Sequence, residues 1–505
     1  MLFTCCLLSV VLAQSQNINR SSFTKDSLNI YMNLALTGWR IPGAAVCIIK
    51  DDKIVVMKGY GIKELGMMNK VDENTLFMIG ANTETFTATA LAMLQSNNRL
   101  SLDDKITKYL PEFKLDNKTA GEQATIRDLL CHHLGFESFQ GNFTFYNTNL
   151  TNRQIIEKMG GIKAAYPFRT KWGYSNAAYA VAGEIIPWVA GKTWEDYLRG
   201  AFFSPLGMRN TQTFTKDMPY SSNRTVPHTL VDGRLTAIPY AQLDGLAPAV
   251  SICSSINDLS KWVMALLNDG KVGNKQVIPP AAIAATYQQQ DVVGNVHRLN
   301  GETDEQQYGL GWFLENYAGH HLVMNNGRAN GYLSSITLVP QEHLGIIILT
   351  NTDQNLLFEA LRWEILDAFF KMPYRNYSEM YLKRYKTNEA KKLLIDKRLR
   401  DSVALNLSPA MAINNYTGRY TNELYGNMTV TQGENNNLEI RFEHHPKMYV
   451  HLQPLGGNRF YATFSDPEYG KAVFPFIFQN GRITSVRVKV NDEVERSPYD
   501  FKKVE

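Results

Sequence analysis

The chain has 505 residues, which is too long for one ordinary domain and favours two. A hydrophobic fraction of 44% with 20% charged residues is typical of a globular protein with sizeable cores. The net charge of +4 is small for this length and is not gathered into a basic tract, so composition gives nucleic-acid binding no support.

The chain begins with a short apolar run, Met1 to Ala13. Val11 and Ala13 are small residues suited to positions −3 and −1 of a cleavage site before Gln14, which predicts a secretory signal peptide, although no Lys or Arg precedes the run. No later stretch approaches the roughly 20 apolar residues that a membrane span needs. We therefore expect a secreted, extracellular protein without a membrane span.

Asn-x-Ser/Thr sequons agree with passage through a secretory pathway. The candidate glycosylation sites are Asn19, Asn117, Asn142, Asn149, Asn223, Asn376, Asn406, Asn415 and Asn427. Of the cysteines, Cys5 and Cys6 would leave with the signal, so Cys47, Cys131 and Cys253 remain. These three allow either one disulfide or three buried free thiols, and no Cys/His cluster predicts zinc.

The next part of the chain alternates between strand and helix patterns. Residues 27–36 have helical spacing, and residues 44–49 and 54–60 form a predicted β-hairpin. A strand at 77–80 leads into a long apolar helix at 83–94, and residues 152–202 are mostly helical in pattern. Strand patterns return at 322–323, 332–339 and 345–350. We expect one sheet assembled from both ends of this region and covered by helices.

The character of the chain changes near residue 372, first to a charged helical pattern and then to short alternating strands. We predict an α+β domain at 20–372, a charged helical linker at 373–407, and a small all-β antiparallel domain, a barrel or sandwich, at 408–505. The signal peptide occupies 1–13.

Several motifs follow one another between about residues 25 and 370. They are residues 77–88, 124–135, 172–183, 308–312 with 347–351, and the shorter 205–208. In this order they resemble the serine β-lactamase and penicillin-binding-protein superfamily, in its esterase and D-peptidase branch. The resemblance implies a sheet flanked by helices, and the C-terminal part resembles the small β-barrel appended to some members.

Active members of this superfamily carry Ser-x-x-Lys on the first turn of a helix, where the amine takes the proton as the serine oxygen attacks. This chain has Ala81 at the serine position and Glu84 at the lysine position. No serine lies between residues 70 and 95, so a shifted alignment supplies no nucleophile. Thr83 and Thr85 are turned by about 200° and 40° from position 81, which points Thr83 away and places Thr85 one turn deeper.

The resemblance implies two further motifs around the same pocket. Tyr-x-Asn is present as Tyr174 and Asn176, with Ser175 between them expected to point away. His/Lys-x-Gly is changed, because Asn325 stands at the polar position while Gly327, which lets substrate approach the strand, is kept. Tyr174 and Asn176 either persist as structural residues or keep a binding role.

A carboxylate at position 84 would repel an anionic tetrahedral intermediate. We therefore predict a pseudoenzyme without serine-type acyl transfer, with no catalytic residue, no cofactor and no metal. His132 and His133 resemble a metal pair, but the family segment is a helix end and turn, which favours structural histidines.

The leading hypothesis is a secreted, catalytically inactive β-lactamase-like protein with a binding or structural role in an extracellular matrix. The chain resembles the gigasin-type β-lactamase-like proteins of mollusc shell matrices, although acidic runs are absent. One alternative is an esterase or D-peptidase with an unrecognised catalytic arrangement. Another is a pseudoenzyme that binds peptidoglycan-like ligands.

Overall fold

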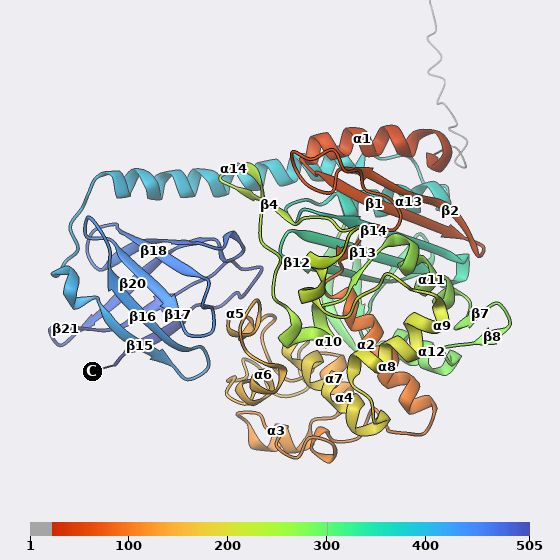
Figure 1. The fold of residues 1–505 in the computed structure, drawn as a ribbon, viewed down its shortest axis with the longest axis horizontal. Coiled ribbons are helices and arrows are strands. Elements are labelled where there is room, and N and C mark those ends of the chain that lie inside the picture. The colour runs from red at the N-terminus through yellow and green to blue at the C-terminus, as the bar shows by residue number, and fades with distance from the viewer. Residues whose placement is uncertain (1–22, 300, 505) are drawn as a thin grey trace, which may run out of the picture.

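The computed structural model describes residues 23–299 and 301–504, and Figure 1 shows an α+β body on one side and a β-barrel on the other. The predicted signal peptide, Asn19, Cys5 and Cys6 lie outside the described residues. No helix in the described part is long and apolar enough to cross a membrane.

The α+β body is built on an eight-stranded antiparallel sheet. As the sequence predicts, its N-terminal hairpin pairs with the last strand of the domain. Ala44 lies opposite Thr350, and Lys50 lies opposite Leu344. In spatial order the strands are β2 (Lys53–Gly61), β1 (Gly43–Lys50), β14 (Leu344–Thr350), β13 (Tyr332–Val339), β12 (His320–Ala329), β11 (Phe313–Tyr317), β10 (Thr303–Tyr308) and β9 (Asp291–His297).

Helices cover both faces of this sheet. Alternate side chains of β1 enter different apolar cores, Val46 and Ile48 on one face and Cys47 and Ile49 on the other. Burial on both faces explains why the strand is a continuous apolar run. The first face is covered by α1 (Leu28–Trp39) and α13 (Leu357–Phe370), and the second by α2 (Asn82–Ser96) and α11 (Ile256–Leu267).

A mostly helical region packs around α2 on the second face. It contains α3 (Lys118–Gln123), α4 (Ile126–Leu130), α5 (Asn142–Phe145), α6 (Asn152–Met159), α7 (Asn176–Ala190), α8 (Trp194–Leu198), α9 (Ser204–Leu206), α10 (Ala247–Val250) and α12 (Pro280–Tyr287). Short strand pairs join β3 (Phe77–Met78) to β6 (Cys253–Ser254), β4 (His228–Val231) to β5 (Arg234–Ala237), and β7 (Lys271–Val272) to β8 (Lys275–Gln276).

The C-terminal domain is a closed antiparallel barrel, which selects the barrel over the sandwich. Its strands are β15 (Gly418–Asn422), β16 (Gly426–Gln432), β17 (Leu438–Phe442), β18 (Tyr449–Pro454), β19 (Arg459–Phe464), β20 (Lys471–Gln479), β21 (Arg482–Val488) and β22 (Tyr499–Lys503). The 28-residue helix α14 (Tyr377–Ala404) runs from the α+β body to this barrel (Figure 1). At 1.5 Å per residue it is about 42 Å long.

The barrel is plugged by a side chain from the α+β body. Phe143 of α5 is 1% exposed and belongs to the apolar core of the barrel. Its ring lies 5.5 Å from that of Tyr499 and 5.1 Å from that of Phe442. Aromatic rings at such separations contribute beyond the area that they bury.

Hydrogen bonds fix the backbone around this plug. The carboxylate of Glu495, in the barrel, accepts the backbone N–H groups of Gly141 at 2.7 Å and Phe143 at 3.0 Å. His445 of the barrel lies 2.8 Å from the Phe143 carbonyl oxygen. A second contact joins Arg328 of β12 to Glu468 of the barrel in an ion pair. The barrel is therefore docked against the α+β body at more than one place.

Cys47, Cys131 and Cys253 are buried free thiols, so of the two possibilities left by the sequence the structure has the free form. Burial raises the pKa of Cys47 to about 12, which keeps its thiol protonated.

Replacing the plug tests how strongly the two parts depend on each other. We expect Phe143→Ala to destabilise the protein by about 3–5 kcal/mol, because it opens a cavity inside the barrel. Urea unfolding followed by tryptophan fluorescence and limited proteolysis of α14 measure this. Phe478→Ala, at a barrel position that is 48% exposed, is the control and should change little. Equal effects of the two substitutions would show that the plug carries no docking energy.

Candidate functional site

The predicted nucleophile position lies where the chain enters α2. Ala81 precedes the helix, and Gly80 before it has a φ of +52°. A Cβ at position 80 would lie 2.5 Å from the Arg328 carbonyl oxygen, so only glycine allows strand β12 to pass this close. Ala81 therefore sits at the start of a helix beside β12, in the place that the resemblance implies for a nucleophile.

Glu84 lies one turn into α2 and is completely buried. Its Oε1 is 2.8 Å from the Tyr174 hydroxyl oxygen, and its Oε2 is 3.3 Å from that of Tyr308. Nε2 of His132 lies 3.8 Å from the same Oε2. Acid, phenols and imidazole thus form one cluster, hereafter the Glu84 cluster, where active members place a lysine.

The hydrogen bonds of Tyr174 indicate how Glu84 is protonated. The Tyr174 hydroxyl oxygen lies 2.8 Å from Glu84 and 3.0 Å from Oδ1 of Asn176. A phenol has one proton and Oδ1 can only accept, so a neutral Glu84 that donates to Tyr174 satisfies both contacts. Burial raises the pKa of Glu84, which favours this neutral form, although His132 and the two tyrosines oppose the shift.

Tyr174 is not suited to act as a base here. Burial is the largest cause that raises the pKa of Tyr174 well above its ordinary value, and Glu84, whenever it is ionised, raises this pKa further through its charge. A lysine at position 84 would have the opposite effect, because a cation stabilises a phenolate. The change from lysine to glutamate therefore removes the amine and also holds the retained tyrosine in its protonated form.

A chain of amides connects this cluster to the barrel. Asn176 donates from Nδ2 to Oδ1 of Asn142 at 3.0 Å, and Asn142 donates from Nδ2 to the Val494 carbonyl at 3.1 Å. Asn142 is 6% exposed, and its amide is used on both sides. A glycan on Asn142 would break these hydrogen bonds, so this sequon differs from the exposed ones in the folded protein.

The Asn325 side chain is buried and hydrogen-bonded to the backbone, and it does not face an open pocket. Its Nδ2 donates to the carbonyl oxygens of Ala81 and Gly311, both at 3.0 Å, and the residue is 2% exposed. Gly327 is required because the backbone of a neighbouring segment passes too close for a side chain, not because of substrate access. A Cβ at this position would lie 1.8 Å from the Ile79 carbonyl oxygen, inside any allowed contact.

The structure brings the predicted pocket residues together as a buried group. All six are buried, and the most exposed of them that have a side chain, Ala81 and Tyr174, are only 9% exposed. The six residues are Ala81, Glu84, Tyr174, Asn176, Asn325 and Gly327. Two neighbouring hydroxyls point away as expected. Thr83 accepts from the Ile252 backbone N–H, and Ser175 caps α7 by accepting from the Ala178 N–H.

Sequence reasoning missed two members of the Glu84 cluster, Tyr308 and His132. Both lie in stretches that carry the family resemblance, but no spacing rule connects them to position 84. Nε2 of His132 also lies 3.2 Å from the Tyr308 hydroxyl oxygen, so this ring nitrogen is hydrogen-bonded to another side chain of the protein. Among the residues that the structure describes, no group of three or more His, Cys, Asp or Glu side chains could hold a metal ion.

The other sequons differ in accessibility. Asn223 and Asn427 are half-buried, and Asn223 donates to the Asp72 carboxylate at 2.9 Å. The exposed candidates are Asn117, Asn149, Asn376, Asn406 and Asn415.

The pH dependence of stability tests the buried acid. An unfolded Glu loses its proton near its ordinary pKa of 4.5, whereas folded Glu84 holds it to higher pH. The stability that this proton contributes is therefore complete below pH 4.5 and is lost as pH rises through the folded pKa. Relative to the wild type, Glu84→Gln should gain stability as pH rises, by about 1.4 kcal/mol for each unit of pKa shift.

Urea midpoints measured at several pH values between about 4 and 8.5 check this difference. Glu122→Gln, at an exposed position of α3, is the matched control and should follow the wild type at every pH. Parallel curves for the wild type and Glu84→Gln would contradict a raised pKa at position 84.

Two family models match the chain. The model for Beta-lactamase covers residues 34–369, and a domain of unknown function, DUF3471, covers residues 405–503. Protein flp of Staphylococcus aureus (strain NCTC 8325 / PS 47) is 28% identical over 334 residues, which are 65% of this chain and 64% of that protein. The matched region thus spans less than two thirds of that relative's length.

A fungal relative matches more of the chain. Unguisins hydrolase ungD' of Aspergillus campestris (strain IBT 28561) is 26% identical over 423 residues, 80% of this chain and 77% of that protein.

Solved structures agree with the fold. The octameric penicillin-binding protein homologue from Pyrococcus abyssi has a TM-score of 0.61 at 21% identity and covers 94% of this chain and 99% of its own. A D-stereospecific amidohydrolase from Streptomyces sp. has a TM-score of 0.53 at 19% identity, over 66% of this chain and 95% of its own. Since the Beta-lactamase model spans most of the chain on a matching fold, the protein belongs to the β-lactamase family.

Proposed function

We propose that this protein is a secreted member of the β-lactamase family that performs no serine-type acyl transfer and has a binding or structural role outside the cell. One observation carries the first part of the proposal. The buried acid Glu84, bonded to Tyr174 and Tyr308, occupies the place of the catalytic lysine beside Ala81.

Chemistry supports the loss of acyl transfer. Alanine has no oxygen to attack a carbonyl carbon, and loss of the serine alone in a serine hydrolase costs on the order of 10⁶ in rate. A carboxyl group at position 84 supplies no positive charge to an oxyanion, and a protonated Tyr174 takes up no proton. Asn325 is held by two backbone carbonyls, so its amide N–H groups are not directed at a substrate.

The proposed location rests on the N-terminal apolar run and on the exposed sequons. An extracellular matrix, as in the gigasin-type resemblance, is the setting that we propose for the binding or structural role. Proteomic analysis of matrix extracts from the source tissue tests it, and absence of peptides from this chain would count against the matrix assignment.

A hydrolase with another catalytic arrangement is the second candidate, favoured by the Glu84 cluster, which contains an acid, an imidazole and two phenols within a few ångströms. Relatives that are hydrolases by name are consistent with it. A turnover screen with esters and D-amino-acid peptides tests this candidate. Activity that falls on Tyr174→Phe but survives in Phe478→Ala would support it.

Covalent labelling tests the proposed inactivity directly. We expect no labelling of the wild type by a fluorescent penicillin or fluorophosphonate probe beyond that of heat-denatured protein. An active family member serves as the positive control. Labelling that disappears on denaturation would falsify the proposal.

A rescue variant separates two causes of inactivity. Ala81→Ser with Glu84→Lys and Asn325→His restores the groups that the resemblance requires. Labelling of this variant would show that only the reactive groups are missing. Absence of labelling in a variant that melts like the wild type would show that the burial of the site also excludes the probe.

A further inference from the structure

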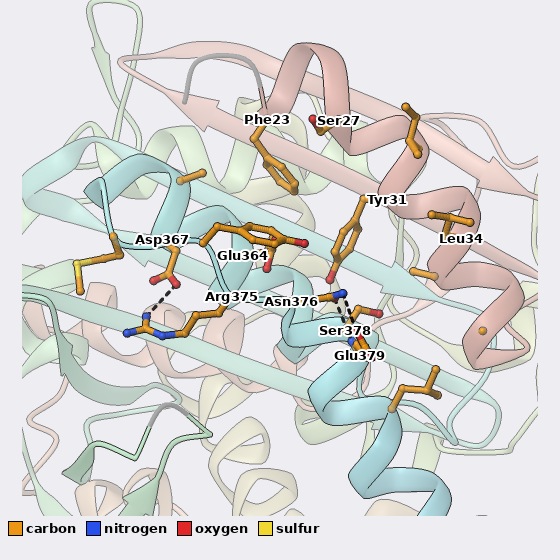
Figure 2. Close-up of a pocket in the computed structure, with 17 residues that line it drawn as sticks. Phe23, Ser27, Tyr31, Leu34, Glu364, Asp367, Arg375, Asn376, Ser378 and Glu379 are labelled. Carbon is orange, nitrogen blue, oxygen red and sulfur yellow. Dashed lines mark hydrogen bonds and ion pairs between the residues drawn. The ribbon is translucent and has the colours of Figure 1, made fainter. Parts of the chain in front are cut away.

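A cavity of about 640 Å³ lies between α1, the end of α13 and the start of α14 (Figure 2). It is on the sheet face opposite the helix that carries Glu84, and no member of the Glu84 cluster lines it. The volume falls in the range of roughly 300–1,000 Å³ that small-molecule sites have.

The mouth of this cavity is apolar. Ile30 and Leu34 of α1 are 64% and 70% exposed, and Tyr374, between α13 and α14, is 66% exposed. Apolar surface that stays in contact with water is unfavourable relative to buried apolar surface. A ligand with an apolar body would cover these three side chains and gain that free energy.

A buried acid lies in the wall. Glu364 of α13 is 3% exposed, and neither of its carboxyl oxygens has a hydrogen-bond partner among the described residues. Burial and, less strongly, Asp367 raise the pKa of Glu364 to about 8, while the backbone N–H of Tyr377 opposes the shift without reaching hydrogen-bond geometry. A buried carboxyl without a partner is costly, so a ligand that pairs with it is favoured.

The wall offers a ligand a second polar group, the hydroxyl of Tyr31. The Tyr31 hydroxyl of α1 is buried and has no hydrogen-bond partner in the part of the chain that the structure describes. Ser378 lies near enough to lower the pKa of Tyr31 against the larger effect of burial, yet the two hydroxyls do not meet hydrogen-bond geometry. Figure 2 shows Phe23 and Tyr31 pointing from one wall toward the start of α14 on the other.

The charge of the wall is negative. Asp367 and Glu379 line the cavity beside Glu364, and Arg375 is the one cation among its described lining residues. With a pKa of about 8, Glu364 itself is largely protonated at neutral pH, and pairing with a cation would ionise it. Nη1 of Arg375 lies 3.2 Å from Oδ2 of Asp367, so this guanidinium is paired with another carboxylate, and no described side chain forms an ion pair with Glu364. A ligand cation would complement this wall.

We propose that the cavity is a binding site for an amphiphilic amine, whose ammonium group pairs with Glu364 and whose apolar body covers Ile30, Leu34 and Tyr374. The Tyr31 hydroxyl is placed to accept from the same ammonium group. This site is independent of the Glu84 cluster, so its existence does not depend on the proposed loss of catalysis.

Calorimetric titration of the full chain with n-decylamine, below its micelle concentration, tests the site. Decanol has the same apolar body without charge, and decanoate has the opposite charge. We expect decylamine to bind in a 1:1 complex at least tenfold more tightly than either. Glu364→Gln should weaken binding of decylamine at least tenfold and leave binding of decanol unchanged, whereas Glu423→Gln, at an exposed barrel position, is the matched control.

Variants that fill or narrow the cavity test whether the ligand binds inside it. Ala368→Trp should abolish binding. If that variant does not fold, Leu34→Trp, at a position that is 70% exposed, should weaken binding by narrowing the mouth of the cavity. Thermal melting confirms folding of each variant. Absence of binding, equal binding of the three probes, or binding unaffected by both Glu364→Gln and Leu34→Trp would overturn the proposal.

Discussion

The buried carboxyl of Glu84 constrains how the interior of the α+β domain packs around it. An acid taken out of water needs hydrogen-bond partners, and in this protein Tyr174 and Tyr308 supply them while His132 lies close by. These partners come from separate parts of the chain, the loop before α7, the end of β10 and the turn after α4. Packing at this centre is consequently organised around satisfying one acid.

This polar centre extends beyond its own domain. Tyr174 contacts Asn176, Asn176 contacts Asn142, and Asn142 reaches the barrel at Val494. Glu495 next to it holds the backbone of the same loop. A polar network of this kind is stable only when each member is satisfied, so the barrel contributes to order around Glu84 without touching it.

The sequence predicted the architecture because the patterns that determine it are local. Alternation, apolar runs and Gly or Asp turns gave the hairpin of β1 and β2, the helix α2 and the β-rich C-terminal domain. The six pocket positions followed from the family resemblance of the motifs that contain them. Partners such as Tyr308 could not be found in this way, since a contact 224 residues away depends on the packing of sheet against helix. For the same reason, Asn142 had the sequence of a glycosylation site but the surroundings of a core residue.

The position of Phe143 has a consequence for the exchange of domains by recombination. The two family models match separate parts of the chain, residues 34–369 and 405–503, as two interchangeable modules would. Yet the core of the second module contains a ring encoded within the first. A recombination event between residues 369 and 405 would therefore separate the barrel from part of its own interior. An exchange of this barrel would have to include the segment around α5 to keep the barrel core filled.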